Sequence, residues 1–172
     1  AAGWNAIQKA RYERQQKLGP MPAGMKPALP KGVPDWNKLP EQARRVQAKR
    51  MAIYAGMLEY LDRDVGRLTA HLQARGMLDN TMIMLMSDNG AEGSQLLDVF
   101  PDYYKKNFDM SFARMGERGS YSEYGPVWAS VSSTPLSGLK ISTLEGGIRA
   151  PLIVRHPATV PAGSRSDAYT YV

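Results

Sequence analysis

The feature that most constrains the fold is a long amphipathic segment that leads into a short apolar run. Between residues 41 and 75, apolar side chains recur at spacings of three and four and charged side chains fill the other faces, which predicts a helix. At about 1.5 Å per residue this helix would be about 50 Å long. Thr81–Met86 is apolar throughout, the pattern of a strand covered on both faces. Together they indicate an α/β fold and half of a βαβ unit in a parallel sheet.

Local patterns place the other segments. Trp4–Leu18 has helical periodicity and ends at the stop signal Gly19-Pro20. Six prolines from Pro20 to Pro40 then predict an extended connector. Residues 94–138 have weak periodicity, which predicts irregular segments with short helices. Leu152–Arg155 is a second candidate for a buried strand.

Methionines are frequent along the predicted long helix and the strand after it. Because methionine is flexible and apolar, we expect these side chains to fill the core rather than to bind a metal. The six that support this expectation are Met51, Met57, Met77, Met82, Met84 and Met86.

The positive charge is concentrated near the N-terminus. Residues 1–50 contain eleven Lys and Arg against three Asp and Glu, a balance of +8, whereas the remaining 122 residues have a balance of −2. Since basic side chains neutralise phosphates without regard to sequence, a non-catalytic basic interaction module is one interpretation. The basic residues form no nucleic-acid-binding motif, which favours a solvated helix face and a loop, and we expect no nucleic-acid partner.

Several classes of protein are excluded by composition. The chain has no cysteine, so it holds no disulfide scaffold, thiolate metal site or cysteine nucleophile. Its longest apolar runs fall far short of the roughly 20 residues that span a bilayer, and we expect no membrane span. The first residues lack the apolar region of a signal peptide, and the missing initiator Met suggests processing or an excised fragment.

The first candidate for chemistry is Ser87-Asp88-Asn89-Gly90, which follows the apolar run directly. Ligands of open α/β sheets collect at the carboxyl ends of strands. The carboxylate of Asp88 and the carboxamide of Asn89 supply the oxygen atoms that Ca²⁺ or Mg²⁺ prefers. The same sequence is also typical of a turn, because Asn and Gly tolerate positive φ. A divalent ion needs six or more ligands, so this pair cannot complete a site alone.

The second candidate is Lys140, which precedes the pair Gly146-Gly147. A lysine can meet an anion as a compact point charge, and glycines let the backbone approach other groups closely. Taken alone, the pattern is also that of a surface lysine near a turn.

Together these segments resemble the arylsulfatases in order and spacing. The matching parts are Met-Ser-Asp-Asn-Gly-Ala-Glu-Gly at 86–93, Tyr-Gly-Pro-Val-Trp at 124–128, and Lys140 nine residues before Arg149 within Glu-Gly-Gly-Ile-Arg-Ala-Pro. Residues 3–15 and 61–68 also look like that family, so the resemblance covers essentially the whole chain.

The resemblance implies a formylglycine-dependent hydrolase of sulfate esters that requires Ca²⁺ or Mg²⁺. Its fold would be the alkaline-phosphatase-like three-layer sandwich, with a mostly parallel sheet flanked by helices. Asp88 and Asn89 would be two ligands of the divalent ion, and Lys140 would contact the sulfate or its bridging oxygen. Positive groups suit this role, because the sulfate oxygens gain or redistribute charge as the S–O bond breaks. Residues 1–40 would form a basic helix and proline-rich connector, and residues 41–172 part of the catalytic domain.

The family's nucleophile motif, Cys/Ser-x-Pro-x-Arg, is not found. The closest segment, Ser133–Ser137, has Ser where Arg is required, and we reject it as the site. The family's paired aspartates are also missing, and His71 and His156 match none of its catalytic histidines, so we expect both to be structural. We therefore expect an internal fragment whose formylglycine lies outside this chain and which does not turn over substrate by itself.

Other side chains near the motifs have two interpretations each. Glu92 could support the metal ligands or be an exposed carboxylate, and Arg149 is expected to form a structural ion pair rather than bind sulfate. Tyr121, Tyr124 and Trp128 could line a pocket for an aromatic acceptor or pack a loop onto the sheet.

Other functions and properties stay open at this point. A phosphonate monoester hydrolase or phosphodiesterase of the same superfamily is the nearest alternative, because such enzymes use a similar metal site. The expected partner is a small sulfate ester of unknown identity. The resemblance favours a periplasmic or secreted location over a cytoplasmic one, and the sequence does not indicate an oligomeric state.

Overall fold

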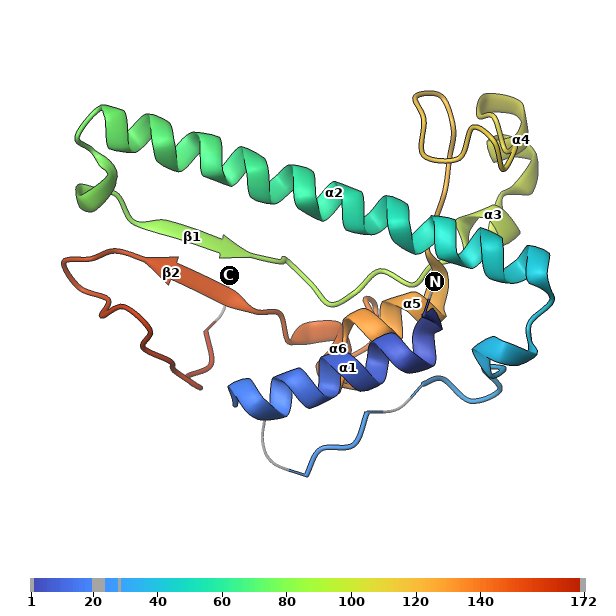
Figure 1. Cartoon of the computed structure of the whole chain (residues 1–172), viewed down its shortest axis with the longest axis horizontal. Coiled ribbons are helices and arrows are strands. Elements are labelled where there is room, and N and C mark those ends of the chain that lie inside the picture. Colours follow the sequence, from blue (N-terminus) through green and yellow to red (C-terminus); the bar gives the residue numbers. More distant parts are fainter. Residues whose placement is uncertain (1, 20–23, 28, 171–172) are drawn as a thin grey trace. The chain divides into compact units, whose positions relative to one another are not determined.

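The computed structural model describes residues 2–19, 24–27 and 29–170. The elements of the chain are shown in Figure 1 and are, in order, α1 (Gly3–Leu18), η1 (Trp36–Lys38), α2 (Glu41–Ala74), η2 (Leu78–Asn80), β1 (Ile83–Met86), α3 (Leu96–Val99), α4 (Pro101–Asn107), α5 (Gly125–Ser132), α6 (Glu145–Ile148) and β2 (Leu152–Arg155). Pro20 and Pro22 of the predicted connector lie outside the described residues. None of the helices in the described part of the chain has the length and apolar character that a membrane crossing requires.

The chain divides into two compact units. The first comprises Ala1–Gly56 and Gly90–Arg149, and the second comprises Met57–Asn89 and Ala150–Val172. The domain boundary predicted at residue 40 stays a prediction. In the structure, the residues on both sides of this position belong to the first unit.

The two predicted helices are confirmed, and glycines end both of them. After α1, Gly19 adopts a φ of 68° and its N–H donates to the Gln15 carbonyl at 2.9 Å. After α2, Gly76 adopts a φ of 65°, and the N–H of Met77 donates to the Leu72 carbonyl at 2.9 Å. Both ends use the left-handed conformation that glycine adopts without a steric penalty.

The core of the first unit is built on all three tryptophans of the chain. The ring centroids of Trp4 and Trp36 are 4.8 Å apart, and the Trp128 ring lies 5.8 and 5.9 Å from these two in edge-to-face geometry. Each indole is at most 5% exposed. This cluster therefore joins α1, η1 and α5, which are far apart in sequence.

Hydrogen bonds fix the tryptophans in place. The indole N–H of Trp4 donates to the Pro34 carbonyl at 3.1 Å, and that of Trp128 donates to the Gln47 carbonyl at 3.0 Å. Gly3 lies against the Trp36 ring, where the space leaves no room for a Cβ atom. The proline connector and the start of α2 are thus attached to the same core.

Side chains of α1 also bind the carboxyl end of α5, which lies beside α1 in Figure 1. Arg11 donates to the Val131 carbonyl at 3.2 Å, and Gln15 donates to the Thr134 carbonyl at 2.6 Å. Arg11, one of the basic residues of the N-terminal segment, therefore helps to hold α1 against α5.

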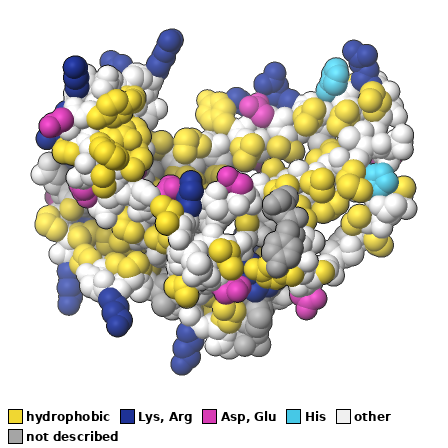
Figure 2. Space-filling view, turned by 180° about the vertical axis from the view of Figure 1, so that it is seen from behind, with side chains coloured by type: hydrophobic (Ala, Val, Ile, Leu, Met, Phe, Trp, Pro, Cys, Tyr) yellow, Lys and Arg dark blue, Asp and Glu magenta, His cyan; other side chains and the backbone are white. Residues whose placement is uncertain are grey.

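The weakly patterned stretch 94–138 forms α3, α4, a loop and α5, as its composition predicts. Tyr104 and Tyr121 lie in contact, with ring centroids 4.2 Å apart, and burial raises the pKa of Tyr121. The carboxylate of Glu123 accepts a hydrogen bond from the N–H of Leu96 at 2.9 Å, which fixes the start of α3. Hydrophobic side chains remain exposed over α3 and α4, at the upper left of Figure 2; they include Val99, Phe100 and Tyr103.

Strands form at both predicted places in the second unit, but their arrangement differs from the expectation. β1 and β2 pair antiparallel, from Ile83 opposite Arg155 to Met86 opposite Leu152. The sequence predicted a parallel sheet, and this pair is antiparallel, because an apolar run carries no information on strand direction. Arg155 ties the sheet to η2 by donating to the Leu78 carbonyl at 2.8 Å and to the Asp79 carboxylate at 2.9 Å.

The expected burial of this sheet is also not found. Most side chains of both strands are exposed, and of the six methionines expected in the core only Met51 is buried. The predicted three-layer sandwich is not seen: within the described residues, the structure has helices and one two-stranded antiparallel sheet, a mixed α/β arrangement.

We predict that Trp128→Ala destabilises the first unit by about 3–5 kcal/mol, because it removes a buried ring from the tryptophan cluster and leaves a cavity. Urea unfolding followed by far-UV circular dichroism measures this change. Val99→Ala is the control, since Val99 is 62% exposed and its truncation should change the free energy of unfolding by less than about 0.5 kcal/mol. Equal effects of both substitutions would contradict the assigned core.

Candidate anion-binding and metal-binding residues

The two sequence motifs meet through their glycines. The N–H of Gly90 donates to the Gly147 carbonyl at 2.8 Å, and a Cβ atom on Gly90 would overlap the Gly146 carbonyl oxygen. The N–H of Gly146 in turn donates to the Ser137 carbonyl at 2.7 Å. Glycine is thus required for close backbone approach at this contact.

Lys140 is held by the segment that follows Gly90. Its N–H donates to the Ala91 carbonyl at 3.0 Å, and its Nζ lies 3.2 Å from Oε2 of Glu92. The lysine and glutamate side chains are 42% and 48% exposed, so both are open to solvent and to a ligand. The other oxygen of Glu92 accepts the N–H of Ser94 at 2.7 Å. The Ser94 side chain, and after it this N–H, hold the pKa of Glu92 below its usual value, with a smaller contribution from Lys140.

Asp88 and Asn89 follow β1 directly, at the carboxyl end of the strand where the sequence predicted them. Asp88 is exposed, and the Ser87 hydroxyl donates to the Asn89 carbonyl at 2.9 Å within the turn. In the described part of the chain, no three His, Asp or Glu side chains are grouped so that they could hold a metal ion. Asp88 and Asn89 therefore offer donors of the type that Ca²⁺ or Mg²⁺ binds, but only part of a ligand set. They belong to the second unit, and Lys140 belongs to the first.

The aromatic residues proposed for an acceptor pocket have other contacts. Trp128 lies on α5 and is 1% exposed, so its ring has no surface for a ligand. It packs on Trp4 and Trp36, and not with a loop onto the sheet as the alternative had it. Tyr124 is half-buried and stacks on Tyr54 with centroids 4.7 Å apart. Burial, with contributions from Tyr54 and the charge of Glu92, raises the pKa of Tyr124 to about 12. Of these two residues, only Tyr124 keeps partial access to solvent.

The remaining candidates occupy ordinary structural positions. Arg149 forms an ion pair with Glu145 at 3.4 Å, one helical turn away. Nδ1 of His156 lies 2.7 Å from the Thr159 hydroxyl, and His71 is exposed on α2. In the rejected segment Ser133–Ser137, Thr134 and Leu136 are buried, and the Ser133 hydroxyl donates to the Gly146 carbonyl at 3.5 Å.

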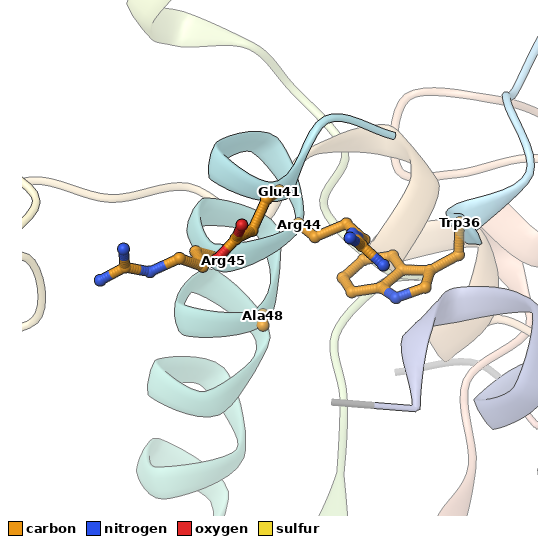
Figure 3. Close-up of a pocket in the computed structure, with 5 residues that line it drawn as sticks. All are labelled: Trp36, Glu41, Arg44, Arg45 and Ala48. Carbon is orange, nitrogen blue, oxygen red and sulfur yellow. The ribbon is translucent and has the colours of Figure 1, made fainter. Parts of the chain in front are cut away.

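A hollow of about 220 Å³ lies at the start of α2 and involves none of the residues named from the motifs. Figure 3 shows Arg44 extending toward the Trp36 ring, whereas Arg45 points away from it. The residues that line this hollow are Trp36, Glu41, Arg44, Arg45 and Ala48. Arg44 and Arg45 belong to the basic N-terminal segment, but Glu41 in the same lining reduces the net positive charge there.

Sequence reasoning did not single out Ser94, whose N–H fixes the Glu92 carboxylate. Local turns of this kind are typical of Asp, Asn, Ser and Thr, and the longer Glu92 side chain left no such signal in the sequence. The close contact of Gly90 with Gly146 was not predicted either, because a glycine's role in a tertiary contact leaves no periodic pattern.

An exposed ammonium can meet an anion as a point charge, and oxygen donors after a strand can meet a hard cation. The comparisons with known proteins specify the class. The family model described as sulfatase matches residues 9–171, and this chain belongs to the sulfatase family.

Three curated relatives agree with this membership. The chain is 36% identical to an uncharacterized sulfatase of Schizosaccharomyces pombe, over 99% of this chain and 32% of the relative. It is 32% identical to an arylsulfatase of Klebsiella aerogenes, over 79% of this chain and 30% of the relative. It is 30% identical to a steryl-sulfatase of Rattus norvegicus, over 68% of this chain and 16% of the relative. The chain thus spans about a third or less of the length of these relatives.

We predict that Gly90→Ala separates the two motif segments, because the new methyl group would overlap the Gly146 carbonyl. Hydrogen exchange should become faster at the amides of residue 90 and Lys140, which donate to the Gly147 and Ala91 carbonyls. Gly56→Ala is the control: Gly56 lies in α2 with no atom within 4 Å of the added Cβ, so the substitution should stabilise the helix by up to about 1 kcal/mol. Unchanged exchange in Gly90→Ala would contradict the close contact.

Proposed function

We propose that the chain forms part of the catalytic domain of a sulfate ester hydrolase of the arylsulfatase type. The observation that carries this proposal is the meeting of the Gly90 segment with the Lys140 loop, because it fixes the two motifs by which the chain resembles the arylsulfatases. Family membership supports the same reaction class. The proposal includes the alkaline-phosphatase-like sandwich as the fold of the whole protein.

Within this proposal, Asp88 and Asn89 contribute two oxygen ligands to a divalent cation, Ca²⁺ or Mg²⁺. Such a cation, when bound, stabilises negative charge on the oxygens of the ester. The carboxylate and carboxamide suit a hard cation, and the exposure of Asp88 leaves it free to bind one. The further ligands would come from residues outside this chain.

Lys140 is proposed to bind the sulfate group through its ammonium. Because charge on the sulfate oxygens increases or shifts as the S–O bond breaks, an ammonium in contact with them lowers the energy of the transition state more than that of the ground state. The same ammonium can give a proton to the departing alkoxide. A formylglycine outside this chain would supply the attacking hydroxyl.

The partner of the site is then a small sulfate ester, and no nucleic acid is required. The exported location favoured by the resemblance remains part of this proposal. The alternative within the superfamily, a phosphonate monoester or phosphodiester hydrolase, is tested by comparing turnover of 4-nitrophenyl sulfate with that of an aryl phosphonate monoester and a bis-aryl phosphate.

We predict that the 172-residue chain alone does not hydrolyse 4-nitrophenyl sulfate with or without added Ca²⁺, because it contains no nucleophile motif. Release of 4-nitrophenol measures the reaction. Ca²⁺ titration followed by calorimetry should give an affinity weaker than micromolar, since most ligands are lacking. Metal-dependent turnover that persists through rigorous purification would overturn the proposed position of the nucleophile.

A longer form of the protein that includes a Cys/Ser-x-Pro-x-Arg motif should turn over 4-nitrophenyl sulfate. In that form, we predict that Lys140→Ala lowers kcat by about 10²–10³, in the range observed when one group that stabilises developing charge is removed. Lys105→Ala is the control, because Lys105 lies exposed on α4 among none of the motif residues. A Lys140→Ala variant with unchanged kcat would remove this lysine from the site.

A further inference from the structure

The residue after Lys140 has an unusual backbone conformation. Ile141, the next residue, has a φ of 80° and is 87% exposed. A β-branched residue is strained in this left-handed region, and apolar contacts do not compensate for the strain because the side chain faces solvent. Ile141 is the third residue of a turn that the N–H of Ser142 closes by donating to the Leu139 carbonyl at 2.9 Å, and the N–H of Lys140 donates to the Ala91 carbonyl at 3.0 Å. The loop thus holds the lysine backbone against the 91–94 segment.

The carboxylate that meets Lys140 is itself oriented from a second direction. Oε1 of Glu92 accepts the Ser94 N–H at 2.7 Å, and Oε2 lies 3.2 Å from Nζ of Lys140. The two oxygens therefore have separate partners, and the Ser94 contact restricts rotation of the carboxylate. A freely rotating surface glutamate would provide no such fixed direction.

A lysine ammonium has three N–H donors. If Glu92 accepts one of them, two remain for the oxygens of an anion. A lysine side chain is otherwise among those that lose the most rotamer freedom when they are fixed. The contact with Glu92 restricts the lysine before any anion arrives, so less freedom is lost on binding.

We propose that Glu92 is a positioning residue for Lys140, orienting its ammonium toward the sulfate of the substrate. This inference rests on the proposed function of Lys140. Glu92 acts through the lysine and does not itself touch the sulfate.

The test uses Glu92→Gln, which keeps the shape of the side chain and removes its charge, together with Glu92→Asp, which keeps the charge on a shorter side chain. Glu117→Gln is the matched control, because Glu117 forms a similarly exposed ion pair with Arg114 at 2.8 Å in the same unit. Circular dichroism and the amide shifts of Gly90 and Gly147 verify that each variant keeps the local fold.

The first readout is NMR of the chain labelled with ¹³C at the ε-carbon of lysine, with the Lys140 signal assigned by its loss in Lys140→Arg. In Glu92→Gln, the Lys140 ε-carbon should become more mobile. Glu92→Asp should leave it less mobile than Glu92→Gln does, and Glu117→Gln should not change its mobility. An unchanged Lys140 signal in Glu92→Gln would overturn the positioning role.

The second readout is turnover of 4-nitrophenyl sulfate by the longer form. We expect Glu92→Gln to lower kcat by about tenfold with little change in KM, because the ammonium is misplaced and not lost. If Lys140→Ala lowers kcat and Glu92→Gln leaves it unchanged, the positioning role fails and the proposed function stands. If Lys140→Ala itself leaves kcat unchanged, the role of Lys140 in the proposed function fails, whatever the NMR signal shows.

Discussion

The packing of three tryptophan rings is the constraint on which the first unit depends. Trp4, Trp36 and Trp128 come from α1, η1 and α5, and each contacts the other two. Large aromatic rings contribute much of the apolar area that a small unit can bury. Because the described part of the chain has few other buried apolar side chains, these three rings decide how α1, η1 and α5 come together.

The position of the motif loop follows from that core. The end of α5 is bound by Arg11 and Gln15, and the chain then passes through a buried stretch, Thr134 to Leu136, before it reaches Lys140. The loop returns at Gly146, whose backbone lies against Gly90. Rigid support on both sides of Lys140 is what a charged group needs if it is to act from a defined position.

Sequence patterns predicted the elements better than their arrangement. Periodicity and glycine stop signals placed α1 and α2, because both features act over one or two helical turns. The direction of β2 and the exposure of Met84 and Met86 could not be predicted, since strand pairing and burial depend on what lies across the sheet and not on the run itself.

The candidate site shows the same division. Residue type made Asp88, Asn89 and Lys140 candidates, and the resemblance to the arylsulfatases implied their roles. The structure adds that the Gly90 and Gly146 segments meet, which the sequence did not predict. Their metal and sulfate roles stay predictions. The ligand-pocket role considered for Trp128 does not fit its burial. A tryptophan can line a pocket or pack in a core, and only its neighbours in the structure decide between these two roles.

The use of the N-terminal charges favours the enzyme over a basic interaction module. Arg11 donates to a backbone carbonyl of α5, and Lys49 donates to the carbonyls of Phe112 and Ala113 at 2.7 and 3.1 Å. Lys49 and Arg45 also lie over the Phe112 ring, at 4.8 and 5.4 Å from its centroid. Cations with such internal partners help to hold α5 and the loop around Phe112 in place. An excess of positive charge in this segment therefore does not by itself require a polyanionic partner, since part of it stabilises the unit that carries Lys140.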